Sequence, residues 1–286
     1  MKPAPFDYHR PEDLQGALSL LSTHDGASII AGGQSLVPMM NYRLAQPDHL
    51  IDINRLSELD YIREEGDCIV IGALARHHKI QSSPLVSRHI PLVTYAYEWI
   101  AHRAVRNRGT LCGNLCHADP ASEMPAIVQI LEATMVLARE GSTREVAATD
   151  FFVGTYETLR QEDEMLVEVR IPKPATDTLW GFEEVSMRKG DFAWTAVACN
   201  MRVQAGILQD VRIAAAGVGA SAIRLRNVET ALTGHAPSAI LFEEAATAAA
   251  SVLEPFGSAS VSAEYKRDLM RALVPRVLNA AIEHAS

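Results

Sequence analysis

Two glycine-centred segments contain the residues of this chain that are best suited to binding chemistry. The first contains Gly32 and Gly33, and the second contains Gly109 and Gly113. Both segments follow apolar runs and precede stretches that we expect to be helical. Glycine has no Cβ and tolerates positive φ, so a ligand can touch the backbone there. Successive backbone N–H groups in such a turn form a concave site for an anion.

The polar side chains of these two loops are short hydrogen-bond donors. They are Ser35 in the first loop, and Thr110 and Asn114 in the second. Two such loops suit a ligand with two linked phosphates and polar groups on either side, such as a dinucleotide. Neither loop matches the G-x-G-x-x-G or Walker A pattern, so Rossmann and P-loop interpretations are weak. For the Gly32-Gly33 pair alone, a tight turn without a ligand is the alternative.

Metal-ligating residue types also occur in the second loop, at Cys112, Cys116 and His117. Structural metal sites usually need three or four matched ligands, and C-x2-C pairs are their common form. The other cysteines, Cys68 and Cys199, are isolated in the sequence. We therefore expect Cys112 and Cys116 to be small filling side chains where the backbone approaches a ligand. We expect no metal ligand in this chain.

Two carboxylates follow the second loop. We expect Asp119 to cap a helix that has Pro120 as its first residue and ends near position 131. Asp119 and Glu123 would then offer acceptors to the hydroxyl or amino groups of a ligand. A catalytic carboxylate pair is the alternative interpretation.

Three other sets of residues have a structural and a functional interpretation. Phe192 follows a Gly-Asp turn, where it could shield a flat heterocycle or be a core aromatic at the start of a strand. Glu183 and Glu184 are most simply part of a solvated face. His77 and His78 stand near a helix start, where a surface or first-turn role is the simpler one.

The composition limits the class of protein. The chain has 286 residues, of which 48% are apolar and 21% charged, and its formal net charge is −9. This is a globular composition, long enough for two ordinary domains. The negative balance offers no field that attracts nucleic acid or anionic lipid. No apolar run is long enough to span a bilayer, and the first residues lack the apolar core of a signal peptide. Four cysteines do not suggest a disulfide framework, so we expect a cytoplasmic protein.

Hydrophobic periodicity predicts the elements that position the loops. The expected helices are 11–22, 36–44, 91–101, 120–131 and three C-terminal helices, the last near 263–284. The expected strands are 27–30, 49–53, 134–138, 164–171, 196–204 and 211–216, with a hairpin formed by 61–64 and 68–71. A turn at Gly206 and Gln209-Asp210 would join the last two strands. This order predicts an α+β fold without the regular βαβ alternation of a doubly wound fold.

The two loops resemble the FAD-binding segments of a known family. Residues 31–53, AGGQSLVPMMNYRLAQPDHLIDI, resemble the first such segment of the medium subunit of molybdenum hydroxylases. This group contains carbon monoxide dehydrogenase, quinoline oxidoreductase and xanthine dehydrogenase. Residues 106–125, RNRGTLCGNLCHADPASEMP, resemble the second segment, and GDFAWTAVA at 190–198 resembles a motif of the C-terminal domain. The resemblance runs over essentially the whole chain.

The resemblance implies a fold and a set of cofactor contacts. A vanillyl-alcohol-oxidase-type FAD-binding domain would span 1–175, with α/β subdomains at about 1–56 and 57–175. A C-terminal flavoprotein domain, an antiparallel sheet with helices, would span 176–286. The family pattern implies no catalytic residue in this chain. The implied FAD-contacting residues are Ala31, Gly32, Gly33, Gln34, Ser35, Leu36, Thr110, Leu111, Cys112, Gly113, Asn114, His117, Glu123 and Phe192.

The resemblance also implies a role in a hetero-oligomeric oxidoreductase. Electrons would leave a substrate at a molybdenum-pterin cofactor on a large subunit and cross two [2Fe–2S] clusters on a small subunit. They would reach FAD on this chain and pass to an external acceptor, in a dimer of heterotrimers. Two alternatives remain at this point. One is a self-contained FAD-dependent oxidase or reductase, and the other is a nucleotide-responsive binding protein without a redox role.

Three positions depart from the family pattern. The second loop usually reads T-I-G-G-N or T-I-G-G-S, and Cys112 replaces its first glycine. Gln34 stands where carbon monoxide enzymes carry histidine, which disfavours carbon monoxide as the substrate. Glu183 and Glu184 occupy a place where relatives often carry a lysine, so a lysine contact to the flavin is not expected here.

Overall fold

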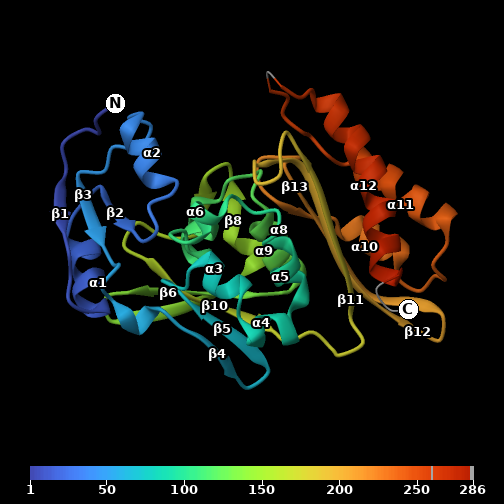
Figure 1. The fold of residues 1–286 in the computed structure, drawn as a ribbon, viewed down its shortest axis with the longest axis horizontal. Helices are drawn as coiled ribbons and strands as arrows, with labels where there is room; N and C mark the ends of the chain where they lie inside the picture. Colours follow the sequence, from blue (N-terminus) through green and yellow to red (C-terminus); the bar gives the residue numbers. More distant parts are fainter. Residues whose placement is uncertain (259, 284–286) are drawn as a thin grey trace.

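The computed structural model describes residues 1–258 and 260–283. Within these residues, three sheets follow one another along the long axis of the molecule (Figure 1). The first is a parallel sheet of order β1-β3-β2, the second has the order β4-β5-β10-β6-β7, and the third β11-β12-β13-β14. This mixture of helices with one parallel and two antiparallel sheets confirms the α+β class.

The N-terminal unit is the small parallel sheet with one helix packed on it. Its elements are β1 (Asp7–His9), α1 (Leu14–Thr23), β2 (Ala27–Ile30), α2 (Leu36–Asn41) and β3 (His49–Asp52). Helix α1 buries Ala17, Leu18 and Leu21, and Asp13 caps it by accepting from Gly16 N at 2.7 Å. Strand β2 has the bounds expected for it, and it delivers the chain directly into the first glycine loop.

The second sheet is antiparallel in every pairing. Its strands are β4 (Ile62–Glu65), β5 (Cys68–Gly72), β6 (Thr134–Arg139), β7 (Ser142–Ala147) and β10 (Met165–Pro172), and a separate ribbon contains β8 (Phe152–Gly154) and β9 (Glu157–Thr158). The expected hairpin is present, and its first strand is shifted by one residue. Short helical segments lie over this sheet: η1 (Ser57–Leu59), α3 (His77–Gln81), α4 (Pro84–His89), α5 (Pro91–Ala96), α6 (Arg103–Arg106), α7 (Leu111–His117), α8 (Glu123–Ile130) and α9 (Ala148–Phe151).

All eight residues of helix α8 are buried. The expected helix start at Pro120 was wrong by three residues. Ala118 takes a left-handed conformation with φ of 50°, and the Asp119 carboxylate accepts from Ala121 N at 2.9 Å, so these residues form a turn. Ser122 is the N-cap residue in place of Asp119. Because the helix begins three residues later than expected, Glu123 is its first residue.

The third sheet carries the C-terminal helices on one face and packs on α8 with the other (Figure 1). Its elements are β11 (Leu179–Ser186), β12 (Ala193–Gln204), β13 (Ile207–Ala216), β14 (Ile223–Arg224), α10 (Arg226–Leu232), α11 (Ala239–Ser251) and α12 (Ala263–Glu283). Side chains alternate along β12. Ala196 and Ala198 join the core around α8, whereas Val197, Cys199 and Met201 join the core under the C-terminal helices. Small residues on the first face allow α8 to approach the sheet closely.

Two sequence expectations about this sheet were wrong. Gln209 and Asp210 lie inside β13 rather than in a turn, because Ala205 and Gly206 alone reverse the chain with positive φ. Glu184 does not lie on a solvated face, since it is 4% exposed in a strand that the sequence did not reveal. In the part of the chain that is described, no helix combines the length and the apolar character needed to cross a membrane.

Candidate functional site

The two glycine loops pack directly against each other. A Cβ built on Gly32 would lie 2.4 Å from the carbonyl oxygen of Arg108 and 2.7 Å from the Cα of Gly109. Such separations are too short for any side chain, so only glycine permits this approach. Segments 77 positions apart in the sequence therefore form one continuous backbone surface, as expected for two loops that share a ligand.

A hydrogen-bond chain holds the two loops together. The Asn54 amide nitrogen donates to the carbonyl oxygen of Ala31 at 2.7 Å, and its oxygen accepts from Arg76 Nη2 at 2.6 Å. Arg76 Nη1 in turn donates to the carbonyl oxygen of Arg108. The Asp52 carboxylate fixes the Asn54 amide at 2.7 Å. Sequence reasoning did not find Asn54 and Arg76, because no local pattern marks a side chain that bridges two distant loops.

Within the first loop, Gly33 has the conformation that requires glycine. Its φ is +69°, in the left-handed region that other residues rarely adopt. The Gln34 amide donates back to the carbonyl oxygen of Gly32 at 3.1 Å, which stabilises the turn. Gln34 itself is exposed, and Ala31, Ser35 and Leu36 are half-buried. The loop thus presents backbone and short polar groups at the surface.

The second loop begins helix α7. Thr110 is its N-cap residue, and the Thr110 hydroxyl accepts from Gly113 N at 3.1 Å. A Cβ on Gly113 would lie 2.8 Å from that hydroxyl oxygen, so glycine keeps the cap accessible. The side chains of Leu111 and Cys112 point into the core and are at most 2% exposed. These two residues can offer a ligand only their backbone.

Burial explains how the second loop tolerates cysteine in place of the usual glycine. Because the Cys112 side chain belongs to the hydrophobic core, its Cβ does not occupy the ligand side of the loop. Burial raises the pKa of the Cys112 thiol well above its usual range, and that of Cys116 to about 11. Both cysteines are free and carry neutral thiols at neutral pH.

Two polar pairs connect the end of α7 to the start of α8. The Asn114 amide nitrogen donates to the Ser122 hydroxyl at 2.9 Å. Beside them, the Tyr156 hydroxyl donates to the Asp119 carboxylate at 3.2 Å, and the His117 ring lies 4.0 Å from the same carboxylate oxygen. Burial lowers the pKa of His117, and the Asp119 charge opposes this shift. Asn114 and His117 are therefore each held in place by a neighbouring polar side chain.

Glu123 and Glu184 form a buried carboxyl pair between α8 and β11. Glu123 is 2% and Glu184 4% exposed, and neither oxygen of Glu184 has a hydrogen-bond partner among the described residues. Burial and the neighbouring carboxyl raise the pKa of Glu184 to about 8. Burial also raises the pKa of Glu123 to about 7. Near neutral pH the pair thus holds at least one proton, so it can both donate and accept a hydrogen bond.

The loop that follows β13 reaches the same region. Gly217, with φ of +79°, donates its N–H to the carbonyl oxygen of Pro120 at 2.7 Å, and its own carbonyl accepts from Lys266 Nζ at 2.7 Å. The Thr155 hydroxyl donates to the carbonyl oxygen of Ala220 at 2.9 Å. The sequence signal that could have found this loop is the G-V-G-A-S run directly after a strand.

Phe192 lies in the turn from β11 to β12 and is 55% exposed. The interpretation of Phe192 as a core aromatic is therefore wrong. The turn packs on the loop before α6, because a Cβ on Gly190 would lie 2.9 Å from the His102 ring. Phe192 is thus an exposed aromatic carried by the C-terminal sheet, near the segment that leads into the second glycine loop.

His77 packs against the second loop on its buried side. It is the first residue of α3, as expected, but it is buried at 5% exposure rather than at the surface. Its backbone N–H donates to the carbonyl oxygen of Gly109 at 3.0 Å, and its ring contacts the Tyr97 hydroxyl at 3.1 Å. Burial, with the Arg106 and Arg76 charges, lowers the pKa of His77 to about 4, so the ring is neutral at physiological pH.

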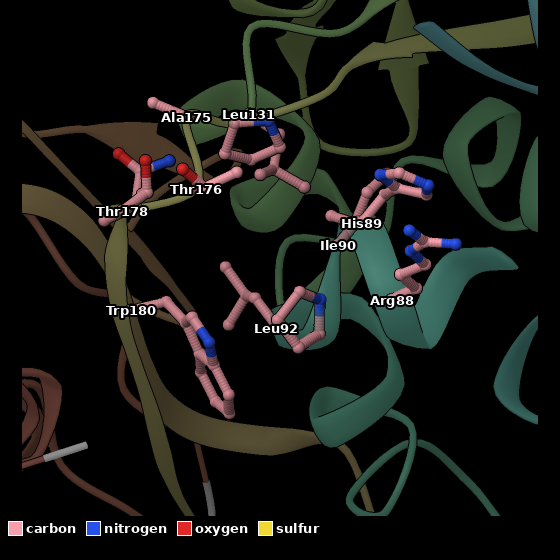
Figure 2. Close-up of a pocket in the computed structure, with 12 residues that line it drawn as sticks. Arg88, His89, Ile90, Leu92, Leu131, Ala175, Thr176, Thr178 and Trp180 are labelled. Carbon is pink, nitrogen blue, oxygen red and sulfur yellow. The ribbon is translucent and has the colours of Figure 1, made fainter. Parts of the chain in front are cut away.

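A cavity of about 130 Å³ lies elsewhere, at the junction of α4 and α5 with β11 (Figure 2). Figure 2 shows Leu92 and Trp180 lining it together with the 174–178 segment, which enters the third sheet. Neither glycine loop contributes to its wall. The cavity is therefore separate from the candidate site.

The residues of the candidate site fit an extended dinucleotide. Glycine backbone and the short side chains of Ser35, Thr110 and Asn114 suit a pyrophosphate, and they come from two loops in contact. Buried carboxyls at Asp119 and Glu123 suit hydroxyl or amino groups. The structure brings the two glycine loops into contact and places Asn114, His117 and Asp119 at the end of α7, whereas Phe192 comes from the turn between β11 and β12.

The comparison with protein families agrees with this geometry. Residues 4–174 match the family described as the FAD binding domain in molybdopterin dehydrogenase. The chain belongs to this family. Residues 180–281 match the CO dehydrogenase flavoprotein C-terminal domain. This molybdopterin dehydrogenase flavoprotein therefore has the FAD-binding domain and the C-terminal domain that the resemblance implied.

Individual relatives match this flavoprotein over nearly their whole length. The carbon monoxide dehydrogenase medium chain of Hydrogenophaga pseudoflava is 40% identical over 98% of both chains. The caffeine dehydrogenase subunit beta of Pseudomonas sp. (strain CBB1) is 37% identical over 99% of this chain and 97% of its own. These relatives are subunits of dehydrogenases, so the chain is an oxidoreductase flavoprotein subunit.

Solved structures agree in the fold. Carbon monoxide dehydrogenase from Hydrogenophaga pseudoflava, in a form that lacks the Mo-pyranopterin moiety, superposes with a TM-score of 0.97 at 41% identity over all of both chains. Quinoline 2-oxidoreductase from Pseudomonas putida 86 superposes with a TM-score of 0.95 at 36% identity, over 100% of this chain and 99% of that one. The same fold therefore serves enzymes that act on very different substrates.

Proposed function

We propose that this chain is the FAD-carrying electron-transfer subunit of a multi-subunit molybdenum hydroxylase. The observation that carries the proposal is the direct backbone contact between the two glycine loops at Gly32 and Arg108. Bound FAD would supply the redox chemistry, accepting electrons from [2Fe–2S] clusters on a partner and passing them to an external acceptor. The family membership supports this assignment.

The residues of this chain would bind and orient the cofactor. The backbone of 31–36 and 110–114 would contact the pyrophosphate, with Ser35, Thr110 and Asn114 as donors. Glu123 and His117 would face polar groups of the cofactor, and Phe192 would lie against the flavin ring.

Among the described residues of the site, we assign the titratable groups to holding the cofactor and none of them to an organic substrate. Glu123 is buried at the start of α8, and burial lowers the pKa of His77 beneath the second loop. Substrate oxidation would therefore take place on another subunit.

The proposed partners follow from this division of labour. A large subunit would carry the molybdenum-pterin cofactor, and a small subunit would carry two [2Fe–2S] clusters. We further propose a dimer of such heterotrimers in the cytoplasm, and a division of this chain into 1–175 and 176–286. The acidic net charge of −9 favours neither nucleic acid nor an anionic membrane as a partner.

Flavin reduction in the isolated chain tests the proposal. The purified, FAD-loaded chain is mixed with dithionite, or with candidate aldehydes and aromatic heterocycles, and the flavin absorbance is followed. Dithionite should bleach the flavin and the organic compounds should not. The co-expressed three-subunit complex should restore substrate-dependent bleaching. An organic substrate that bleaches the flavin of the isolated chain would establish a self-contained oxidase or reductase instead.

A further inference from the structure

Three histidines converge at one edge of the N-terminal sheet. His9 is the last residue of β1, His24 is the C-cap residue of α1, and His49 is the first residue of β3. One ring nitrogen of each lies within 4.8 Å of the other two. β1, α1 and β3 lie together at one end of the molecule (Figure 1). The cluster thus joins three elements that have no other chemistry assigned to them.

The three rings are packed against one another and are only partly exposed. The His24 ring stacks on His49 with centroids 4.2 Å apart, and on His9 with centroids 4.9 Å apart. His9 Nε2 and His49 Nδ1 are 3.0 Å apart. A pair this close cannot carry two protons facing each other, so at least one of these nitrogens presents a lone pair toward the other.

We propose that His9, His24 and His49 bind one divalent transition-metal ion of the zinc type. Neutral imidazole is a preferred ligand of such ions, and three protein ligands with an open fourth position form a recognised zinc geometry. The proposal concerns this N-terminal unit alone and does not depend on the function proposed above.

The observed separations are close to those that a metal needs. With Zn–N bonds of about 2.0–2.1 Å, ligand nitrogens in a tetrahedral site lie about 3.4 Å apart. The His9–His49 pair is already at 3.0 Å, and the largest separation in the cluster is within 4.8 Å. The His24 ring is stacked on His49 with the two planes 29° apart, so metal binding requires this ring to turn and point a nitrogen at the ion. His24 follows the last residue of a helix and precedes a turn at Asp25-Gly26, which is where such a turn of the side chain would occur.

A carboxylate stands next to the cluster. Asp7 Oδ2 lies 4.0 Å from His49 Nδ1, because Asp7 pairs with His49 in the parallel register of β1 and β3. Asp7 is exposed, with 80% of its side chain accessible. Because Asp7 faces the same His49 nitrogen that faces His9, its carboxylate is placed to occupy the fourth coordination position.

The histidine cluster lies at the opposite end of the parallel strands from the first glycine loop, so an ion bound there would have a structural role. His49 and Ala27 pair at the start of the parallel strands, whereas the first glycine loop follows the other end of β2. Four residues of strand span about 10 Å. A metal here would fasten β1, α1 and β3 together and stabilise the unit that presents the first loop, without contacting the cofactor.

Zinc binding by the full-length, FAD-loaded protein tests the proposal. The protein is treated with a chelator, transferred to chelator-free buffer, and titrated with zinc alone by calorimetry, with thermal unfolding followed in parallel. We expect one equivalent to bind and the midpoint of unfolding to rise. Cobalt in place of zinc should give the visible absorption of a tetrahedral site. An unchanged flavin spectrum would accompany both.

Matched variants decide which residues bind the ion. His24→Gln and His49→Gln should each weaken zinc binding by more than the roughly 10–100-fold that the loss of an outer partner costs. His235→Gln, at an exposed histidine of the C-terminal domain, should bind zinc as the parent does. The flavin content of each variant shows that it has folded.

Two outcomes would overturn the proposal. In one, the folded parent protein takes up no zinc at a stoichiometric level. In the other, His24→Gln and His49→Gln retain one tightly bound equivalent, which would place the ion elsewhere. In either case the three rings would be only a stacked cluster, and the flavin function proposed above would be unaffected.

Discussion

The carbonyl oxygen of Arg108 occupies the space into which any side chain at Gly32 would project, 2.4 Å from the position of its Cβ. This contact joins a loop of the small parallel sheet to a loop that precedes α7. Because it is made by backbone on both sides, it fixes how far apart the two loops stand. The geometry of the cofactor site therefore depends on a glycine that need not itself touch the cofactor.

Gly32→Ala should weaken FAD binding as well as lower stability. The new methyl group must displace the Arg108 carbonyl, and overpacking of this kind costs about 1–3 kcal/mol. The movement separates the two loops, so we expect at least about a tenfold loss of FAD affinity, equivalent to about 1.4 kcal/mol. Flavin fluorescence titration of the flavin-free protein measures the affinity.

Gly206→Ala is the matched control for this variant. Gly206 has φ of +77° in the β12–β13 turn, and a Cβ there would have nothing within 4 Å. Backbone strain alone should cost about 1–2 kcal/mol. We expect that variant to lose stability and keep its FAD affinity. Equal FAD affinity in Gly32→Ala and the parent would contradict the role of the loop contact.

Arg76 and Asn54 should act as one unit. Arg76→Ala removes a charged donor to the Arg108 carbonyl and to the Asn54 amide, and such bonds contribute about 1.5–3 kcal/mol each. Asn54→Ala removes the hydrogen bond to the Ala31 carbonyl and the acceptor for Arg76, so it breaks the same series of hydrogen bonds. The double variant should therefore be destabilised by less than the sum of the single variants, with an interaction energy of about 0.5–3 kcal/mol. Urea unfolding of the four proteins measures this cycle.

Arg271→Ala provides the comparison for the loss of an arginine. Arg271 pairs with Asp268 on the exposed face of α12, and half of its side chain is accessible. Exposed pairs of this kind contribute about 0–1 kcal/mol. If Arg76→Ala lowered the free energy of unfolding no more than Arg271→Ala does, the hydrogen bonds between the loops would not contribute to stability.

The parts of the fold that the sequence predicted are those fixed by local patterns. The helix expected at 11–22, the strand at 27–30 and the hairpin at 61–64 and 68–71 all lie within a few residues of the elements found. The glycine loops were identified for the same reason, since glycine marks backbone geometry directly.

The parts that the sequence missed depend on contacts between distant residues. Asn54 and Arg76 are 22 positions apart and become partners only when the segment that follows β3 meets the N-cap of α3. Glu184 looked solvated because its neighbour is Glu183, but pairing of β11 with β12 turns successive side chains to opposite faces. Glu183 pairs with Arg276 on one face, while Glu184 faces Glu123 on the other.

The histidine cluster was not predicted for a related reason. His9, His24 and His49 are separated by 15 and 25 positions, which matches no short ligand motif. Their convergence follows from the parallel pairing of β1 with β3 and from the point at which α1 ends. Only the assembled sheet places them together.

Glu184→Gln should make the flavin-free protein more stable at alkaline pH. The pKa of Glu184 is about 8 in the folded protein against an ordinary value of 4.5, so the folded state retains a proton that the unfolded chain has lost. Stability must then fall as pH rises from about 4.5 to about 8. The variant lacks this titration and should gain more than about 1 kcal/mol above that window, since each pH unit is worth about 1.4 kcal/mol.

The same measurement near pH 5 should show little difference between Glu184→Gln and the parent, because the parent carboxyl is then protonated. Glu183→Gln is the control from the neighbouring position, where the carboxylate pairs with Arg276. We expect Glu183→Gln to keep the pH dependence of the parent. If the free energy of unfolding of Glu184→Gln varied with pH as that of the parent does, Glu184 would be ionised in the folded protein.

FAD should be bound without a covalent bond. The side chains of Cys112 and Leu111 point into the core, and burial keeps the thiols of Cys112 and Cys116 protonated. A neutral, buried thiol is a poor nucleophile toward a flavin. Acid precipitation should release all of the yellow colour into the supernatant. Flavin that stays with the denatured pellet, and survives proteolysis as a flavin-labelled peptide, would contradict this prediction.

Phe192→Ala should alter the environment of the flavin without affecting the fold. Phe192 is 55% exposed, and exposed substitutions usually change stability by less than about 0.5 kcal/mol. The turn that carries it packs on His102, seven residues before Gly109, so an aromatic there is placed to cover part of a ligand held by the second loop. Removing the ring should make the bound flavin more accessible to iodide, measured as stronger fluorescence quenching.

Met187→Ala, at a residue that is 57% exposed near the same turn, should leave quenching unchanged. Equal quenching in Phe192→Ala and the parent would mean that the ring does not cover the cofactor, and that the C-terminal domain approaches the flavin through other residues.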